Sequence, residues 1–182
     1  MKKFYIDFYD YDTGYIKNVY DTNIKLNPGN WVYADIYVSG LPPEGEGTVS
    51  MGFDLTFDAS SLEAAGLVLP SYLMDTGRSE IIPGHVRAEA WVVPPGSDVG
   101  GDDILLATFA LHCTAISVDE LWLNDFDETV QWVLKDGSVL DGELFPTHIA
   151  TVDNVPIPGA IWLLGSGLLG LVGTGFRRKK RS

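Results

Sequence analysis

Hydrophobic and polar residues alternate along much of this chain. In residues 49–57 apolar side chains fall on every second position, with serine, glycine, aspartate and threonine between them. Residues 31–38 and 105–114 alternate in the same way. A period of two places one face of a strand in a core and the other in water. The pattern therefore predicts three amphipathic β-strands.

Weaker alternation predicts further strands at residues 86–93, 120–123, 129–134 and 143–151. Clusters of proline, glycine, asparagine and aspartate separate these segments and are typical of turns. Only residues 60–65 have a helical character, for one or two turns. About seven to nine short strands without a long helix predict an all-β fold, an antiparallel β-sandwich.

The C-terminal residues break this pattern. Residues 159–176 are uncharged and mostly apolar, and five basic residues follow them: Arg177, Arg178, Lys179, Lys180 and Arg181. As a helix the apolar segment would be ~27 Å long, close to the ~30 Å hydrocarbon core of a bilayer. The sequence predicts a single C-terminal transmembrane helix over 159–176. The basic stop 177–181 would stay in the cytoplasm, with the body across the membrane.

A proline motif precedes the apolar segment and consists of Val155, Pro156, Ile157 and Pro158. The order of proline motif, apolar segment and basic stop resembles the PEP-CTERM sorting signal of Gram-negative bacteria, in its Val-Pro-x-Pro variant. Ile157 stands where the name-giving motif has an acidic residue. The resemblance implies processing by an exosortase-type protease and transit through the inner membrane. The protein would then reach the cell surface or the medium, in association with extracellular polysaccharide or biofilm matrix.

The first ten residues do not form the leader that this destination requires. A signal peptide has an apolar region of roughly 7–15 residues, but Asp7 and Asp10 interrupt residues 4–10. We interpret the absence as a start codon assigned too late, with a leader lost. The alternative is a tail-anchored protein whose body stays in the cytoplasm.

Composition supports an extracytoplasmic body, residues 1–152, followed by the sorting signal, residues 153–182. Five of the 12 Lys and Arg residues lie in the basic stop, which leaves seven against 25 Asp and Glu, so residues 1–176 carry a formal charge of −18. Such a surface repels nucleic acid. Cys113 is the single cysteine. No intramolecular disulfide can form, and we expect Cys113 to pack in the core.

Three segments carry a second resemblance, to cohesin-like domains, which are relatives of the family 2 and 3 carbohydrate-binding modules. These are the Pro-Gly turn and strand of residues 27–40, the Gly-Phe-Asp-Leu-Thr-Phe-Asp strand of residues 52–58, and the strand of residues 104–111. The resemblance spans roughly residues 24–134. It implies a nine-stranded jelly roll that binds dockerins or scaffolds other domains. This sequence shows no dockerin of its own, so no particular partner is implied.

Catalysis is not predicted. His112 and Cys113 are neighbours on a strand, so their side chains point to opposite faces and cannot form a thiolate–imidazole pair. His85 follows a Pro-Gly turn and His148 lies near the end of the body, and neither has metal-ligand spacing. We interpret both as ordinary surface residues. The sequence predicts no cofactor.

Two groups of residues are candidates for binding. Asp125, Asp127 and Glu128 form an oxygen-rich loop of the kind that suits Ca²⁺, although the EF-hand pattern is missing and solvated acidic turns are the simpler interpretation. Trp31, Tyr33 and Tyr37 share the outward face of one predicted strand.

Flat aromatic strips stack on sugar rings, so the aromatic group predicts contact with a glycan unless a loop or second sheet covers it. We therefore expect a non-catalytic envelope or secreted passenger that acts through glycan contact or adhesion. The alternative is a cohesin-type scaffold that binds a protein through a sheet face.

Overall fold

The structure, a computed structural model, describes residues 2–10, 22–127 and 131–154. Nearly all of the regular structure in these ranges is β-strand. The strands are β1 (Lys3–Asp10), β2 (Asn23–Lys25), β3 (Trp31–Ser39), β4 (Thr48–Thr56), β5 (Leu62–Val68), β6 (Leu73–Asp75), β7 (Glu80–Ile82), β8 (His85–Val92), β9 (Ile104–Cys113), β10 (Val118–Asn124), β11 (Val133–Leu134) and β12 (Thr147–Asp153). One short helix, α1 (Asp141–Leu144), precedes β12.

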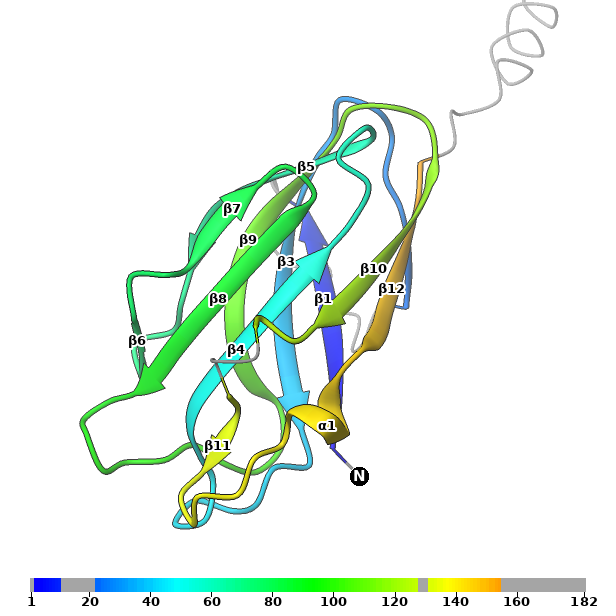
Figure 1. The fold of residues 1–182 in the computed structure, drawn as a ribbon. Coiled ribbons are helices and arrows are strands. Elements are labelled where there is room, and N and C mark those ends of the chain that lie inside the picture. Colours follow the sequence, from blue (N-terminus) through cyan, green and yellow to red (C-terminus); the bar gives the residue numbers. More distant parts are fainter. Residues whose placement is uncertain (1, 11–21, 128–130, 155–182) are drawn as a thin grey trace, which may run out of the picture.

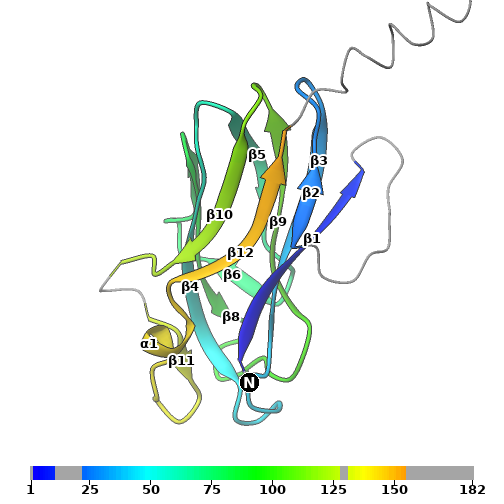
Figure 2. The same ribbon diagram turned by 90° about the vertical axis from the view of Figure 1, so that its right-hand side faces the viewer.

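The strands form two sheets that face each other. The smaller sheet has four strands in the order β1-β3-β9-β5, and the larger has eight. Its path is β2-β12-β10-β4-β8-β6, with β11 added to β4 and β7 to β8. The pairing is antiparallel except between β12 and β2. Figure 1 looks onto the larger sheet, and Figure 2 shows the two layers from the side. The predicted β-sandwich is confirmed.

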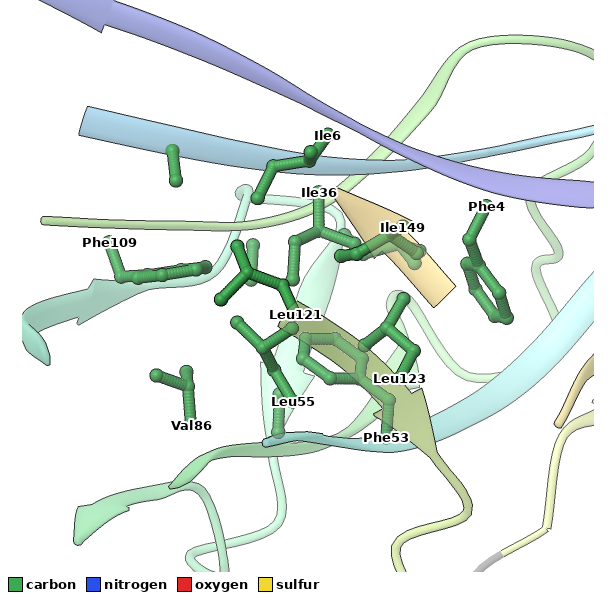
Figure 3. Packing of buried hydrophobic residues seen from close by; sticks show 14 of the residues in the cluster. Phe4, Ile6, Ile36, Phe53, Leu55, Val86, Phe109, Leu121, Leu123 and Ile149 are labelled. Carbon is green, nitrogen blue, oxygen red and sulfur yellow. The ribbon is translucent and has the colours of Figure 1, made fainter. Parts of the chain in front are cut away.

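The core lies between the sheets and is built from the apolar half of each alternating strand. Side chains from both sheets interdigitate there (Figure 3). Its largest fully buried members are Trp132, Phe53, Phe109, Ile6, Ile36, Met51, Leu55, Leu62, Leu106, Leu111, Leu121 and Leu123. The Trp132 indole Nε1–H donates to the Gly52 carbonyl at 2.6 Å, so its one polar group is satisfied inside the core. Burial of this apolar surface is the main stabilising contribution to the fold.

The three strongly alternating segments are strands β3, β4 and β9, as predicted. Strands β8 and β10 also match the weaker predictions at residues 86–93 and 120–123. Strand β9 departs from strict alternation, because its register with β3 shifts at Ile36 and Tyr37. As a result Leu106, which alternation alone places outward, is buried in the core. Ala110 is also buried, but it stays opposite Tyr33 in the unshifted register.

The helical interpretation of residues 60–65 is wrong. Residues 62–68 form strand β5. It pairs with β9, and Leu62 lies opposite Cys113. A turn at Asp58, whose carbonyl accepts from the Ser61 and Leu62 amides, leads into it. The β9 ladder satisfies these backbone groups and buries Leu62, which outweighs the local helix propensity of one or two turns.

Two further predictions near the C-terminal end of the body need correction. The strand expected from residue 143 begins at Thr147, because residues 141–144 form α1 and Pro146 cannot donate to a ladder. Of the strand expected at residues 129–134, the described part is strand only at Val133 and Leu134.

The N-terminal segment, which lacks the apolar region of a leader, is strand β1. It pairs with β3 over its whole length and buries Phe4, Ile6 and Phe8. The alternation of these three residues with Tyr5, Asp7 and Tyr9 is the same period-two signal as elsewhere.

None of the helical structure in the described ranges has the length and hydrophobicity of a membrane span. The proline motif, the predicted transmembrane helix and the basic stop lie in residues 155–182, outside the described residues.

Candidate interaction surfaces

The outer face of the smaller sheet carries the three aromatic residues that were predicted to contact glycan. Each stacks against a ring on a neighbouring strand. Tyr37 stacks on Tyr5, with ring centroids 5.2 Å apart, and Tyr33 stacks on Tyr9 at 5.2 Å. Trp31 stacks on the imidazole of His112 at 4.4 Å. The alternation therefore places the three residues on one face, as predicted, and one ring face of each lies against a neighbour.

A carboxylate stands between these aromatic pairs. Asp35 accepts hydrogen bonds from the hydroxyls of Tyr9 and Tyr37, both at 3.3 Å, and from the Thr108 hydroxyl at 2.5 Å. Burial, together with the charge and hydrogen bond of Asp35, raises the pKa of Tyr9 to about 12. The polar groups of this face are thus largely bonded to one another.

The outer face of the larger sheet differs from that of the smaller sheet, because it contains a hollow. A hollow of about 690 Å³ lies where β8 meets β6 and the segment around β11. Its apolar lining includes Trp91, Met74, Val93, Pro95 and Val133. The Trp91 residue is 59% exposed and Met74 is 54% exposed. The alternating pattern predicts the strand that carries Trp91 but not this hollow, because the other walls come from segments distant in the sequence.

Away from the hollow, toward the start of β8, the same face carries a charged network. Asp54 on β4 lies 3.0 Å from Nδ1 of His85 and 3.2 Å from Nε of Arg87, both on β8. Arg87 also reaches Glu80 on β7 at 3.2 Å. Its hydrogen bond to Asp54 is the main cause that raises the pKa of Arg87. His85 was interpreted from the sequence as an ordinary surface residue. It is the first residue of β8, and Asp54 is its carboxylate partner.

Arg78 links strand β8 of this face to the loop after β10. It pairs with Glu89 on β8 at 3.3 Å and with Asp127 in the loop after β10, and its guanidinium lies 4.9 Å from the centre of the Phe126 ring. The loop predicted as a calcium candidate is thus held by a cation of the protein itself.

The other members of that predicted loop give no metal geometry. Glu128 lies outside the described residues, and Asp125 lies in the same loop as Asp127. Within residues 2–10, 22–127 and 131–154 no group of three or more His, Cys, Asp or Glu side chains is arranged to hold a metal ion.

At the opposite end of the face from the hollow stands Trp122 on β10. The residue is 37% exposed, its indole Nε1–H donates to Glu120 at 3.0 Å, and its ring lies 5.1 Å from the imidazole of His148 on β12. His148 thus belongs to this surface, while His112 lies on the outer face of the other sheet. Cys113 is fully buried on the side opposite His112, as predicted.

Comparison with known proteins identifies the fold. No family model matches the chain, and no curated protein matches it. Solved structures of cohesins match it over most of their length. The sixth cohesin of scaffoldin B from Acetivibrio cellulolyticus, solved in complex with a Cel5 dockerin mutant, has a TM-score of 0.54 at 17% identity. The match covers 84% of this chain and 99% of that one.

Two further cohesins agree. The OlpA cohesin of Clostridium thermocellum, in complex with Doc918, has a TM-score of 0.56 at 13% identity, covering 85% of this chain and 99% of that one. A non-cellulosomal cohesin from the archaeon Archaeoglobus fulgidus has a TM-score of 0.53 at 12% identity, covering 87% and 95%. The body of the present chain has a cohesin-like β-sandwich fold.

Proposed function

We propose that this chain is a non-catalytic protein-binding module, and that it binds its partner through the outer face of the eight-stranded sheet. The apolar hollow around Trp91 is the observation that carries this proposal. An exposed tryptophan and methionine beside a concave apolar wall are the features of a hot spot, where a partner side chain is desolvated on both sides.

The geometry of the sheet limits how a partner can bind there. Strands β10, β4 and β8 each have a neighbour on both sides, so their backbone groups are used in the ladders (Figure 1). Along these three strands a partner cannot add a strand and has to contact side chains. Recognition would therefore depend on Trp91, Met74 and the charged network on the same face.

The similar proteins support a protein partner. Two of the cohesins described above were solved in complex with dockerins. Because identity is below one fifth, we take from them a binding role of the fold and not the identity of a partner. The likeness to binding modules is consistent with a chain that is not an enzyme.

A capture experiment tests the proposal. The full chain, kept in a mild detergent, is immobilised and exposed to the envelope and secreted proteins of the organism that encodes it. Wild type, Trp91→Ala and Trp31→Ala serve as baits, the last because Trp31 lies on the other sheet. We expect a protein that wild type and Trp31→Ala retain and Trp91→Ala does not.

The retained protein is then identified by mass spectrometry, purified and titrated against the same variants. We expect Trp91→Ala to raise the Kd about tenfold or more, the effect of truncating a hot spot. Circular dichroism shows whether each variant is folded. If no retained protein distinguishes Trp91→Ala from wild type, the proposal is refuted.

Glycan contact through Trp31, Tyr33 and Tyr37 is the second candidate. Its support is the gathering of aromatic rings on the outer face of the smaller sheet, together with the carboxylate and hydroxyl groups of Asp35 and its neighbours. Retention on purified matrix polysaccharide that falls in Trp31→Ala and Tyr37→Ala, but not in Trp91→Ala, would favour it over protein binding. Equal retention of all three variants would refute it.

For the C-terminal region we propose sorting by an exosortase-type protease and delivery to the cell surface or the medium. The support is the sequence of the proline motif, apolar segment and basic stop in residues 155–181. Intact-mass analysis of the mature protein tests this proposal. A chain that ends near Pro158 is the expected result, whereas a chain that retains Ser182 contradicts it.

A further inference from the structure

Strand β4 shows how far apart two exposed tryptophans lie on the proposed binding face. Its outward-facing residues include Ser50, which is paired with Trp91 on β8, and Thr56, which is paired with Trp122 on β10. The two positions are six residues apart, and at ~3.4 Å per residue the tryptophans lie ~20 Å apart along the strands. Both rings are on the same face, at opposite ends.

The Arg78 bridge lies between these two ends. Glu89, one of its partners, is paired with Gly52, which stands between Ser50 and the charged Asp54 on β4. From there Arg78 extends to the loop after β10, where it meets Phe126 and Asp127. The face therefore has two regions at its ends, with the ion pairs of Arg78 between them.

The two regions differ in chemistry. The first is the apolar hollow at Trp91. The second, around Trp122, contains the Glu120 carboxylate and the imidazole of His148. Across β4 from it, Asp54 binds His85 and Arg87, and Arg87 also binds Glu80, so the region holds three carboxylates and one guanidinium beside two imidazoles. The second region is therefore net negative, and its arginine is not available to an acidic partner. An aromatic ring next to carboxylates suits a cation.

We infer that the partner protein spans both regions, with an apolar side chain in the hollow at Trp91 and a lysine or arginine side chain against Trp122 and Glu120, ~20 Å away. This inference rests on the proposed function. It adds a second contact and assigns the charge of the partner there.

The purified partner from the capture experiment is the probe. Its Kd for the full chain is measured by calorimetry at several salt concentrations, with wild type, Trp91→Ala, Trp122→Ala and Glu120→Gln. The matched control is Glu63→Gln, which removes an exposed carboxylate from the outer face of the other sheet.

We expect Trp122→Ala to raise the Kd about tenfold. Glu120→Gln keeps the acceptor of the Trp122 indole but removes the charge, so it should raise the Kd about 2–5-fold at low salt. It should also reduce the dependence of the Kd on salt. Trp91→Ala should weaken binding without changing the salt dependence, and Glu63→Gln should change neither quantity.

The outcomes separate the two proposals. If Trp91→Ala weakens binding while Trp122→Ala and Glu120→Gln behave like Glu63→Gln, the second contact is refuted and protein binding at the hollow stands. A stronger interaction for Glu120→Gln would also refute the inference, because the partner would then be acidic at that place. If Trp91→Ala binds as wild type does, the proposed function itself fails.

Discussion

Single carboxylates join loops that are distant in sequence, and Asp98 is the clearest case. Its side chain is 3% exposed and accepts hydrogen bonds from the amides of Gly45 and Gly47 and from Nζ of Lys135, at 2.7–2.8 Å. The Lys135 hydrogen bond, with those of the two amides, holds the pKa of Asp98 below its ordinary value of 3.8. One residue thereby ties three loops at one end of the sandwich.

Replacement of this carboxylate should lower stability in a pH-dependent way. Because the folded state lowers the pKa of Asp98, the stabilisation is present at neutral pH and is lost as the pH falls below 3.8 toward the folded-state value. We expect Asp98→Asn to lower the urea midpoint at neutral pH, and the difference from wild type to shrink on acidification. Urea unfolding curves of wild type and variant, recorded at neutral and at acidic pH, measure this difference.

Glu44→Gln is the control for this variant, since Glu44 is an exposed carboxylate near the same loops. It should leave the urea midpoint almost unchanged at both pH values. A difference between Asp98→Asn and wild type that stays constant on acidification would mean that the charge of Asp98 does not contribute, and that the loss comes from replacing an acceptor oxygen with an NH2 group.

At the level of elements, the sequence predicts strands well where one face is buried and the other is wet. Residues 31–38 and 49–57 satisfy this condition, and both strands place the expected residues inside except Val49, which lines the hollow. The prediction failed at residues 60–65, which have no strong period and become an edge strand only because β9 provides a ladder. Strand propensity of that kind is non-local and cannot be read from a short window.

The candidate surfaces were predictable to a smaller extent. Alternation on β3 correctly grouped Trp31, Tyr33 and Tyr37, because the three residues lie on one strand. The pair of Asp54 and His85 depends on the register between β4 and β8, and the bridge from Arg78 to Asp127 depends on two loops that meet in space. Local patterns contain no information on register, so only residues of one element could be grouped in advance.

The whole molecule relies on one core, because the single cysteine cannot form an intramolecular disulfide. Cys113 ends strand β9 on the core side, and its thiol donates to the Ala115 carbonyl at 3.3 Å. Burial raises the pKa of this thiol, which disfavours the reactive thiolate. The residue is therefore inaccessible and unreactive for as long as the sandwich remains closed.

The alkylation of Cys113 should consequently report the opening of the fold. We expect mass spectrometry to show that iodoacetamide leaves the native chain unmodified. With added urea, the alkylation rate should rise in parallel with the loss of the far-UV circular dichroism signal. Val118→Cys in a Cys113→Ala background is the control, since Val118 is two-thirds exposed and should be modified at once in the native state. Rapid alkylation of Cys113 without urea would instead show that the end of β9 opens locally. The sandwich would then not unfold as one cooperative unit, because the β5–β9 side of the smaller sheet would separate before the rest.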